Sequence, residues 1–277
     1  MTDLSYRNVK RVALYKLHDT IGRKLSNHIR FIHTSELLNW AGKMAWSIQS
    51  PYDTIVYVPD SGYLPGRVMA DIFQYPLLSS DSSFEAHSPK NILIVDDTAN
   101  TGETMKLAKA KVQTAFPNAK VETAAVIVSK GHEFVVDHYH TAIQRDRMCE
   151  WNMHKADLGH VVTDMDGVLC ENPKENYLEW IYSDPKERFI PERKLDTIVT
   201  ARREEYRLVT QRWLAQHGVR YESLKMGLTD MNDRIELIKG MRPKPDLILE
   251  SDISHAKRLW NSTGIPTLCF DTKEMFS

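Results

Sequence analysis

The stretch Thr163-Asp164-Met165-Asp166-Gly167-Val168-Leu169 follows two valines near the middle of the 277-residue chain. Its apolar lead-in is typical of a buried strand, and the two carboxylates and the glycine are typical of the loop in which such a strand ends. A second stretch of this kind lies upstream, where residues 92–95 lead into Asp96 and Asp97. Two such sites predict two catalytic domains rather than one.

Short apolar runs alternate with helical patterns along the chain. We expect strands at 54–58, 92–95, 124–128, 160–163, 195–200 and 247–250, and helices at 66–73, 104–115, 204–217, 233–241 and 254–261. This alternation is typical of α/β proteins with parallel sheets, and continuous Val/Ile runs fit strands buried on both faces. Because the alternation pauses within 151–159, we expect one domain at 1–153 and a second at 154–277.

The composition, 42% hydrophobic and 26% charged, is that of a globular protein. A net charge of -1 gives no general attraction to nucleic acid or to a membrane surface. No apolar run reaches the roughly 18–20 residues needed to span a bilayer, and the N-terminal residues lack the apolar core of a signal peptide. Cys149, Cys170 and Cys269 show no CxxC spacing and are expected to be free thiols in a reducing cytosol. We therefore expect a cytoplasmic protein without nucleic-acid or membrane partners.

The acids of the upstream site precede a segment rich in Thr and Gly, residues 98–104, that opens a helix. Backbone N–H groups at a helix N-terminus attract anions, and a glycine there lets a phosphate approach closely. Asp96 and Asp97 would repel a phosphate, so we expect them to face hydroxyls or a metal. A ribose 5-phosphate combines both requirements. A strand, turn and helix capped by Thr101 or Thr104 is the structural alternative.

This stretch resembles the phosphoribosyl pyrophosphate (PRPP) motif of type I phosphoribosyltransferases. The resemblance implies a phosphoribosyltransferase-like fold for the N-terminal domain, and a homodimer. It implies that Asp96 and Asp97 contact the ribose hydroxyls and that the loop holds the 5-phosphate through Thr98, Ala99, Asn100, Thr101, Gly102, Glu103 and Thr104. The implied activity is transfer of ribose 5-phosphate to a base, or release of a base from a nucleotide.

Residues 58–67 resemble the family's pyrophosphate loop, in which backbone amides and a basic residue bind the diphosphate. The residues in question are Asp60, Ser61, Gly62 and Arg67. Asp60 stands where the family often has a basic residue, and Arg67 supplies a charge at a different spacing. This departure leaves open a non-catalytic domain that senses PRPP or a nucleotide.

The lid and the base-recognition residues are less clearly marked. The family's lid loop would fall at residues 79–89, where His87 and the adjoining Lys90 are the cations, and a plain surface loop fits equally. Lys130 follows a strand, at a place where purine-type relatives have a lysine that meets an exocyclic oxygen. Trp151 offers a stacking face for a base. A solvated lysine and a tryptophan packed at the domain junction are the alternatives.

Asp164 and Asp166 lie two residues apart, before Gly167. Such carboxylates can divide the work of phosphoryl transfer, because one attacks phosphorus while the other protonates the leaving oxygen and later activates water. A magnesium ion would screen the repulsion between carboxylates and phosphate. Later strands and helices contribute further polar residues in this order: Thr200, Lys239, Glu250 and Asp252.

This order resembles the haloacid dehalogenase superfamily of phosphotransferases, over residues 160–277. The resemblance implies a Rossmannoid fold in which Asp164 forms an aspartyl-phosphate and Asp166 is the general acid and base. Thr200 would bind a phosphoryl oxygen, and Lys239 would balance the charge, with Lys225 as its competitor. The implied magnesium ligands are Asp164, the backbone carbonyl of Asp166 and Glu250, with Asp252 in support.

The family's large cap domains have no room here. About 25 residues separate Cys170 from Leu195, which is too few for a separate domain. A capless site is open, and it can accept bulky substrates. Arginines follow Thr200, and they either steer phosphate or form a solvated helix face with neighbouring glutamates; the residues are Arg202, Arg203, Arg207, Glu204 and Glu205.

The two resemblances together predict a bifunctional enzyme of nucleotide metabolism. The N-terminal domain would act on PRPP and a base or nucleotide, and the C-terminal domain on a phosphate monoester, the transferase product being the simplest candidate. The alternative is a magnesium-dependent phosphatase regulated by a sensing domain. A working transferase fused to a degenerate C-terminal domain is the third reading.

Overall fold

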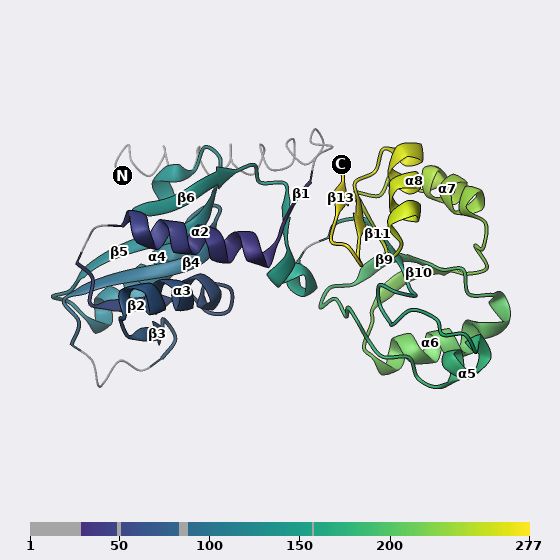
Figure 1. Cartoon of the computed structure of the whole chain (residues 1–277), viewed down its shortest axis with the longest axis horizontal. Helices are drawn as coiled ribbons and strands as arrows, with labels where there is room; N and C mark the ends of the chain where they lie inside the picture. The colour runs from purple at the N-terminus through teal and green to yellow at the C-terminus, as the bar shows by residue number, and fades with distance from the viewer. Residues whose placement is uncertain (1–28, 49–50, 83–87, 157) are drawn as a thin grey trace, which may run out of the picture. The chain divides into compact units, whose positions relative to one another are not determined.

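The computed structural model describes residues 29–48, 51–82, 88–156 and 158–277 (Figure 1). Contacts divide the described residues into an N-terminal unit, Ile32–Asn152, and a C-terminal unit, Met153–Ser277, with which residues 29–31 group. Both units are mixed α/β structures with parallel sheets. The domain limits expected from the sequence stay a prediction.

The N-terminal unit contains a five-stranded sheet in the order β3-β2-β4-β5-β6, and all its neighbouring strands are parallel. Its strands are β2 (Thr54–Tyr57), β3 (Leu77–Ser79), β4 (Asn91–Ala99), β5 (Lys120–Ser129) and β6 (His138–Ile143). Strand β4 lies in the centre, and its pairing with β5 runs from Asn91 to Ala99.

Helices cover both faces of this sheet. Helices α2 (Thr34–Ser47) and α3 (Tyr63–Phe73) share a core with one set of strand residues, which includes Ile55 and Leu93. Helix α4 (Glu103–Ala115) shares a second core with the alternate set, which includes Val56 and Ile94. Since successive side chains of a strand point to opposite faces, the unit has three layers with the sheet in the middle.

Strand β4 corrects one expectation from the sequence. We expected the strand to end at residue 95, but the ladder continues through Asp96, which pairs with Ala125, and Thr98, which pairs with Ile127. The physical reason is the length of β5, which offers partners to Asp96, Thr98 and Ala99 of the extension. The two acids are therefore held on a rigid strand rather than on a loop.

The C-terminal unit contains a six-stranded sheet in the order β10-β9-β8-β11-β12-β13. Its strands are β8 (Val161–Asp164), β9 (Leu195–Val199), β10 (Tyr221–Lys225), β11 (Leu247–Glu250), β12 (Thr267–Cys269) and β13 (Met275–Phe276). All pairs are parallel except the edge pair of β12 and β13, which is antiparallel.

Helices α7 (Met231–Gly240) and α8 (Ile253–Thr263) pack on this sheet through an apolar cluster. In it, Ile235 and Ile238 of α7 and Leu259 of α8 meet Val162 and Ile248 of the sheet. The connection from β8 to β9 contains the six-residue helix α5 (Tyr177–Tyr182), and the connection from β9 to β10 contains α6 (Arg207–Gln216).

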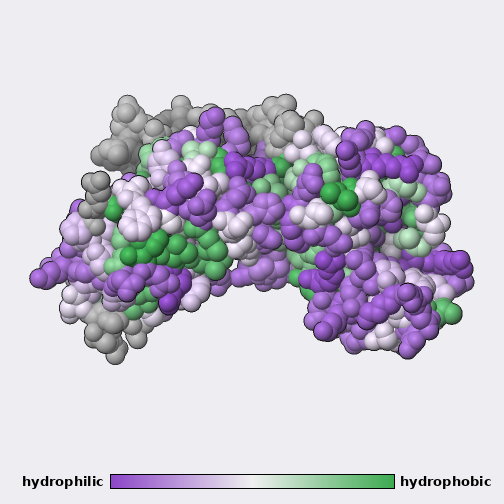
Figure 2. All heavy atoms as spheres, in the orientation of Figure 1, coloured by the Kyte–Doolittle hydropathy of each residue, from purple (hydrophilic) through white to green (hydrophobic). Residues whose placement is uncertain are grey.

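The remaining elements are short: β1 (Arg30–Ile32), β7 (Arg147–Cys149) and the 3₁₀ turns η1 (Glu133–Val135), η2 (Glu150–Lys155) and η3 (Glu204–Tyr206). In the part of the chain that the structure describes, no helix combines the length and the apolar character needed to cross a membrane. The face of the molecule seen in Figure 2 is mostly hydrophilic, with smaller hydrophobic areas. Cys149, Cys170 and Cys269 form no disulfide, and Cys170 and Cys269 are buried.

Candidate active sites

A cavity of about 340 Å³ opens in the N-terminal unit between the carboxyl ends of β2 and β4. The chain moves from β2 outward to β3 and then returns to place β4 on the other side of β2, so this is the switch point at which open parallel sheets bind ligands. The cavity is lined by Val58, Pro59, Ser61, Asp96, Asp97, Thr98, Ala99, Asn100, Thr101, Gly102, Glu103, Thr104, Met105, Arg145 and Asn152.

The two acids at this cavity have different surroundings. Asp97 accepts hydrogen bonds on Oδ2 from Trp151 Nε1 at 2.5 Å and from Asn152 Nδ2 at 3.1 Å. Asp96 accepts on Oδ1 from the Asp97 backbone N–H at 2.9 Å and from Ser61 Oγ at 3.4 Å. Burial, followed by the negative charge of Asp97, raises the pKa of the Asp96 carboxyl well above its usual range. Two neutral side-chain donors therefore hold Asp97 in place. The side-chain hydrogen bond that Asp96 accepts from Ser61 is longer than either of these.

The loop after β4 delivers the N-terminus of α4 to the same cavity. Gly102 precedes the helix with φ at 77°, and a Cβ there would lie 2.7 Å from Val135 Cβ, so both the backbone conformation and the packing require glycine. Thr101 and Thr104 are exposed at the cavity and offer hydroxyls beside the first amides of the helix. The arrangement can hold a phosphate through neutral donors.

The residues of the expected pyrophosphate loop divide into two groups. Ser61 lines the cavity, and Gly62 lies where a Cβ would come within 2.6 Å of the carbonyl oxygens of Val58 and Val95. Asp60 is exposed. Arg67 lies on the exposed side of α3, where its guanidinium pairs with Asp71 at 2.8 Å.

This geometry corrects the expectation that Arg67 supplies the loop's charge. Arg67 and Asp71 stand one helical turn apart and satisfy each other on the surface. The cation that lines the cavity is Arg145, in the turn between β6 and β7, which the sequence reading missed. Its signal was weak, because it lies far along the chain in a turn with several charges.

The two base-recognition candidates take different places. Lys130 is exposed directly after β5. Trp151 is half-buried against the core of the unit, where its indole N–H braces Asp97. Nearby, Arg147 donates to Asn100 Oδ1 at 2.6 Å and fixes the start of the phosphate loop, and burial lowers the pKa of this guanidinium. The expected lid lies partly outside the described residues, since 83–87, including His87, are not described.

A second switch point lies in the C-terminal unit, between β8 and β11. The chain moves from β8 through β9 to β10 on one side, and β11 then pairs on the other side of β8. Asp164 ends β8 and Glu250 ends β11, so their carboxylates come from adjacent strand ends. Thr200, which follows β9, is completely buried, and its hydroxyl accepts from the Arg202 backbone N–H at 3.2 Å.

Arg234 supplies the cation between these acids. Its Nη1 lies 2.7 Å from Glu250 Oε2 and 3.6 Å from Asp164 Oδ2, and the three side chains are at most 11% exposed. Burial, and then the negative charge of Glu250, raises the pKa of the Asp164 carboxyl well above its usual range, although Arg234 opposes the shift. Arg234 Nε is buried without a hydrogen-bond partner among the described residues, which makes it an available donor.

Lys239 does not occupy this position, and the assignment from the sequence is corrected. Its Nζ lies 2.9 Å from Glu236 Oε1 on the exposed side of α7. Arg234 lies in the first turn of α7 and contacts Asp164 and Glu250, so the first turn of the helix, not its last, faces these acids. Lys239 is five residues beyond Arg234, or about 7.5 Å along the axis. The competing Lys225 is exposed at the end of β10.

The acid after Glu250 also has a different role from the one expected. Asp252 caps helix α8, with Oδ1 accepting from the His255 backbone N–H at 2.9 Å and from Ser254 Oγ. These bonds lower the pKa of its carboxyl. Its support of Glu250 comes through its backbone N–H, which lies 3.4 Å from Glu250 Oε1. Aspartate is among the residues that most often cap the start of a helix, and this role of Asp252 was not predicted from the sequence.

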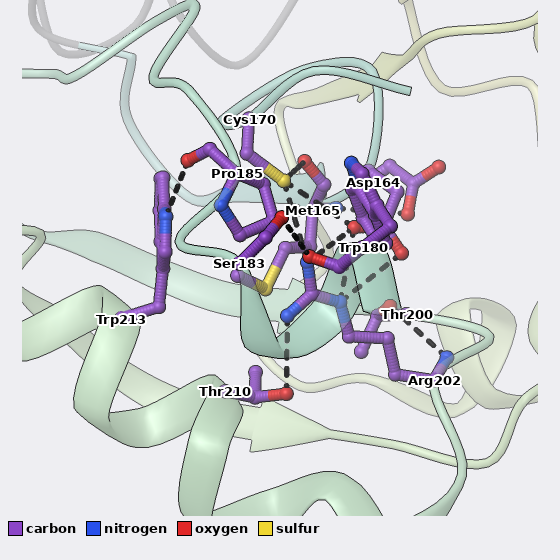
Figure 3. Close-up of polar contacts among 11 residues, drawn as sticks. Asp164, Met165, Cys170, Trp180, Ser183, Pro185, Thr200, Arg202, Thr210 and Trp213 are labelled. Carbon is purple, nitrogen blue, oxygen red and sulfur yellow. Dashed lines mark hydrogen bonds and ion pairs between the residues drawn. The ribbon is translucent and has the colours of Figure 1, made fainter. Parts of the chain in front are cut away.

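Asp166 faces Arg202, which is 2% exposed. Arg202 donates to Asp166 Oδ1 from Nη2 at 2.6 Å, and from Nε at 3.0 Å (Figure 3 shows the surroundings of Arg202). The arginines that follow are different, since Arg203 lies 3.9 Å from Glu205 and Arg207 lies 2.6 Å from Glu204 on the exposed surface. Of the two sequence interpretations, the solvated face therefore fits Arg203 and Arg207, and neither fits Arg202.

The residues at this site fit a magnesium ion in their donor type. Asp164 and Glu250 offer carboxylate oxygens, and a divalent cation would offset both causes of the raised pKa of Asp164, namely burial and then the charge of Glu250. Within the described ranges, no group of three or more His, Cys, Asp or Glu side chains lies close enough together to hold a metal ion. Two carboxylates and a backbone carbonyl would therefore share the ion with water.

No protein-family model and no curated protein matches the chain. Solved structures that match include a Helicobacter pylori xanthine-guanine-hypoxanthine phosphoribosyltransferase, with 12% identity over 45% of this chain and 93% of that chain, at a TM-score of 0.40. A Pyrococcus horikoshii purine phosphoribosyltransferase matches with 18% identity over 44% and 92%, at 0.37. An Aeropyrum pernix orotate phosphoribosyltransferase matches with 17% identity over 39% and 69%, at 0.32. These TM-scores are below 0.5, so the matches do not assign a function to either site.

Proposed function

We propose that the chain is a bifunctional enzyme with a phosphoribosyltransferase site in the N-terminal unit and a phosphatase site in the C-terminal unit. The observation that carries the proposal is common to both units. Each parallel sheet brings a pair of acids to its own switch point, together with groups that suit a phosphorylated ligand. The resemblances of both motif sets to known families support the same assignment.

In the N-terminal unit, the carboxylate of Asp96 accepts hydrogen bonds from the ribose hydroxyls, while Asp97 is held in place by Trp151 and Asn152. The amides and hydroxyls of residues 100–104 hold the 5-phosphate at the start of α4. A nitrogen of the base then attacks C1 of the ribose as the bond to pyrophosphate breaks. The protein's contribution is to hold both partners in line.

In the C-terminal unit, an oxygen of Asp164 attacks phosphorus and the bond to the leaving oxygen breaks, while Asp166 gives that oxygen a proton. Asp166 next takes a proton from water, which attacks the aspartyl-phosphate and releases inorganic phosphate and free Asp164. Arg234 balances the charge of Asp164 and the phosphoryl group throughout. A magnesium ion held by Asp164, Glu250 and the Asp166 carbonyl would add further charge neutralisation.

The test is a reaction of the purified chain with PRPP, magnesium and a panel of bases, followed by mass spectrometry of the products. A nucleoside that accumulates with one base would demonstrate both activities in sequence and name the acceptor. A nucleotide alone would support the transferase and direct the phosphatase to a different monoester. Absence of any base-dependent product, with an aryl phosphate also left intact, would refute the proposal.

One observation favours a second function for the N-terminal unit. Asp60 is exposed in the expected pyrophosphate loop, and Arg67 is paired with Asp71, so that loop brings no cation to the cavity. The unit would then sense PRPP or a nucleotide and regulate the phosphatase. Pyrophosphate release that depends on a base excludes this alternative. A phosphatase rate that responds to PRPP without any such release would support it.

A further inference from the structure

The guanidinium of Arg202, in the C-terminal unit, is engaged on all three of its nitrogens. Nε and Nη2 face Asp166, Nη1 donates to Thr210 Oγ1 at 3.2 Å, and Nη2 also lies 3.4 Å from Cys170 Sγ. The guanidinium carbon is 5.2 Å from the centre of the Trp180 ring. Figure 3 shows Arg202 surrounded by Cys170, Trp180, Thr200 and Thr210, which come from different loops and helices.

These contacts fix the position of Arg202 before any substrate binds. Its side chain is 1% exposed, so the network forms out of water, where hydrogen bonds to charged groups are strong. The rigid fork of the guanidinium holds a carboxylate in one orientation, which a lysine could not do. Thr210 on α6 and Trp180 on α5 hold the fork from its far side and its face.

The two oxygens of Asp166 are left in different states by this arrangement. Oδ1 receives Nη2 at 2.6 Å and Nε at 3.0 Å, and Cys170 Sγ lies 3.3 Å away. Oδ2 receives Nε at 3.2 Å. Oδ1 is therefore saturated by the protein, and Oδ2 is the oxygen with remaining capacity for a partner.

We infer that Arg202 is a positioning residue for the phosphatase reaction. It holds Asp166 by Oδ1 so that Oδ2 is presented to the leaving group and to the attacking water. The inference rests on the proposed phosphatase function. Its physical basis is preorganisation, because a proton donor misplaced by as little as an ångström loses much of its effect.

The experiment compares Arg202→Lys with the matched control Arg203→Lys. Arg203 is the next residue, is 74% exposed and lies 3.9 Å from Glu205, so the control changes the same residue type without touching Asp166. Magnesium-dependent hydrolysis is measured on aryl phosphates whose leaving groups range from good to poor. Thermal unfolding of each variant, and Thr210→Val as a milder change on the far side of the fork, show whether folding accounts for any loss.

We expect R202K to lower kcat with little change in KM, and to do so most for the poorest leaving group. The loss should approach the roughly 10²–10⁴-fold that general acid catalysis contributes. On substrates with good leaving groups, R202K should lower kcat only a few-fold, and T210V should cause a loss of about the same size. In an Asp166→Asn background, R202K should add almost nothing, because Arg202 acts through Asp166.

Two results would overturn the inference while leaving the phosphatase in place. One is a loss in R202K that is equal for all leaving groups; the other is a loss that multiplies with that of D166N. A wild-type chain that hydrolyses no aryl phosphate would instead refute the proposed function, and this inference with it. An R203K variant as impaired as R202K would show that the effect is not specific to the buried pair.

Discussion

The acid pairs of the two units meet opposite kinds of partner. Asp96 and Asp97 are surrounded by neutral donors, namely backbone amides, a serine, an indole and a side-chain amide. Asp164 and Asp166 instead face arginines that are 7% and 1% exposed. Both pairs lie at the switch point of a parallel sheet, so topology alone does not distinguish them.

The difference indicates what each pair can bind. Carboxyl groups with neutral partners can accept the hydrogen bonds that the hydroxyl groups of a sugar donate. Carboxylates that face arginines can approach a phosphoryl group more readily, because the arginines offset part of the local negative charge. This difference is consistent with the proposal that the first pair binds a sugar and the second pair acts on a phosphoryl group.

The largest effect should come from Asp164→Asn. We expect aryl phosphate hydrolysis to fall by about 10⁴-fold or more, as for the loss of a nucleophile that works with its neighbours. Base-dependent nucleotide formation should stay at the wild-type rate, because the transferase residues belong to the other sheet. Parallel loss of both activities in a folded variant would contradict the separation of the sites.

Arg234→Met tests the ionic partner itself. It leaves Asp164 and Glu250 side by side without their shared cation, so the free energy of unfolding should fall by about 3–5 kcal/mol. Urea denaturation measures it, with Lys239→Met on the exposed side of the same helix as the control. K239M should stay within about 0.5 kcal/mol of wild type. If the two variants lost the same free energy of unfolding, Lys239 would be as important an ionic partner as Arg234.

Asp97→Asn tests the neutral partners. The amide offers a single acceptor oxygen, and its NH₂ group would face donors from Trp151 or Asn152, so unfolding should become easier by about 1–3 kcal/mol. Asp96→Asn should instead lower transferase turnover at limiting PRPP and leave phosphatase turnover unchanged. A D97N variant as stable as wild type would show that the brace contributes little.

The smallest expected effect is the change with pH in the stability of the Asp96→Asn variant. Because the folded pKa of Asp96 is raised, its ionised form weakens the folded state, and D96N should gain stability over wild type at neutral pH. That gain should shrink as the pH falls, because Asp96 in the folded protein takes up its proton first, and it should vanish below the ordinary value of 3.8, where the unfolded chain is protonated as well. Thermal unfolding from pH 7 to pH 4 measures it.

The pKa of Glu122, in the same unit, is shifted in the opposite direction to that of Asp96. Hydrogen bonds from Lys120, then Tyr52 and His138, lower its pKa to about 2. Its contribution to stability is therefore present above 4.5 and is lost as the pH falls toward 2. The deficit of Glu122→Gln should accordingly shrink in acid, whereas a deficit independent of pH would disprove the assignment.

The sequence predicted several buried strands, but it missed the edge strands β10 and β13 and also β12, whose three residues are all buried. β11 was predicted with its observed bounds and β9 to within a residue, since their runs of apolar residues are continuous. β10 was missed, because in the run Tyr221–Lys225 only Leu224 is buried and the pattern is largely polar. Helix α2 was also missed, although its buried residues Leu37, Ala41, Met44 and Ala45 follow helical spacing.

The acids of both sites were predictable for a simple reason, and their basic partners were not. Carboxylates at the ends of parallel strands gather at one edge, so Asp164 and Glu250 could be paired from strand order alone. Arg234 could be found only by following the direction of α7, which places its first turn at the carboxyl edge. The contact between Arg202 and Asp166 depends on the register between β8 and β9, which no local sequence pattern specifies.

The strand that carries Asp164 has hydrogen-bonded neighbours on both sides, whereas β10 and β13 form the margins of its sheet. Local opening of a folded protein begins where few partners must be released, and the backbone amides there exchange with solvent first. We therefore expect amide exchange to be fast in β10 and β13 and slow in β8. Fraying of the margins would leave Asp164 where it is, so the proposed chemistry should outlast the loosening of the sheet around it.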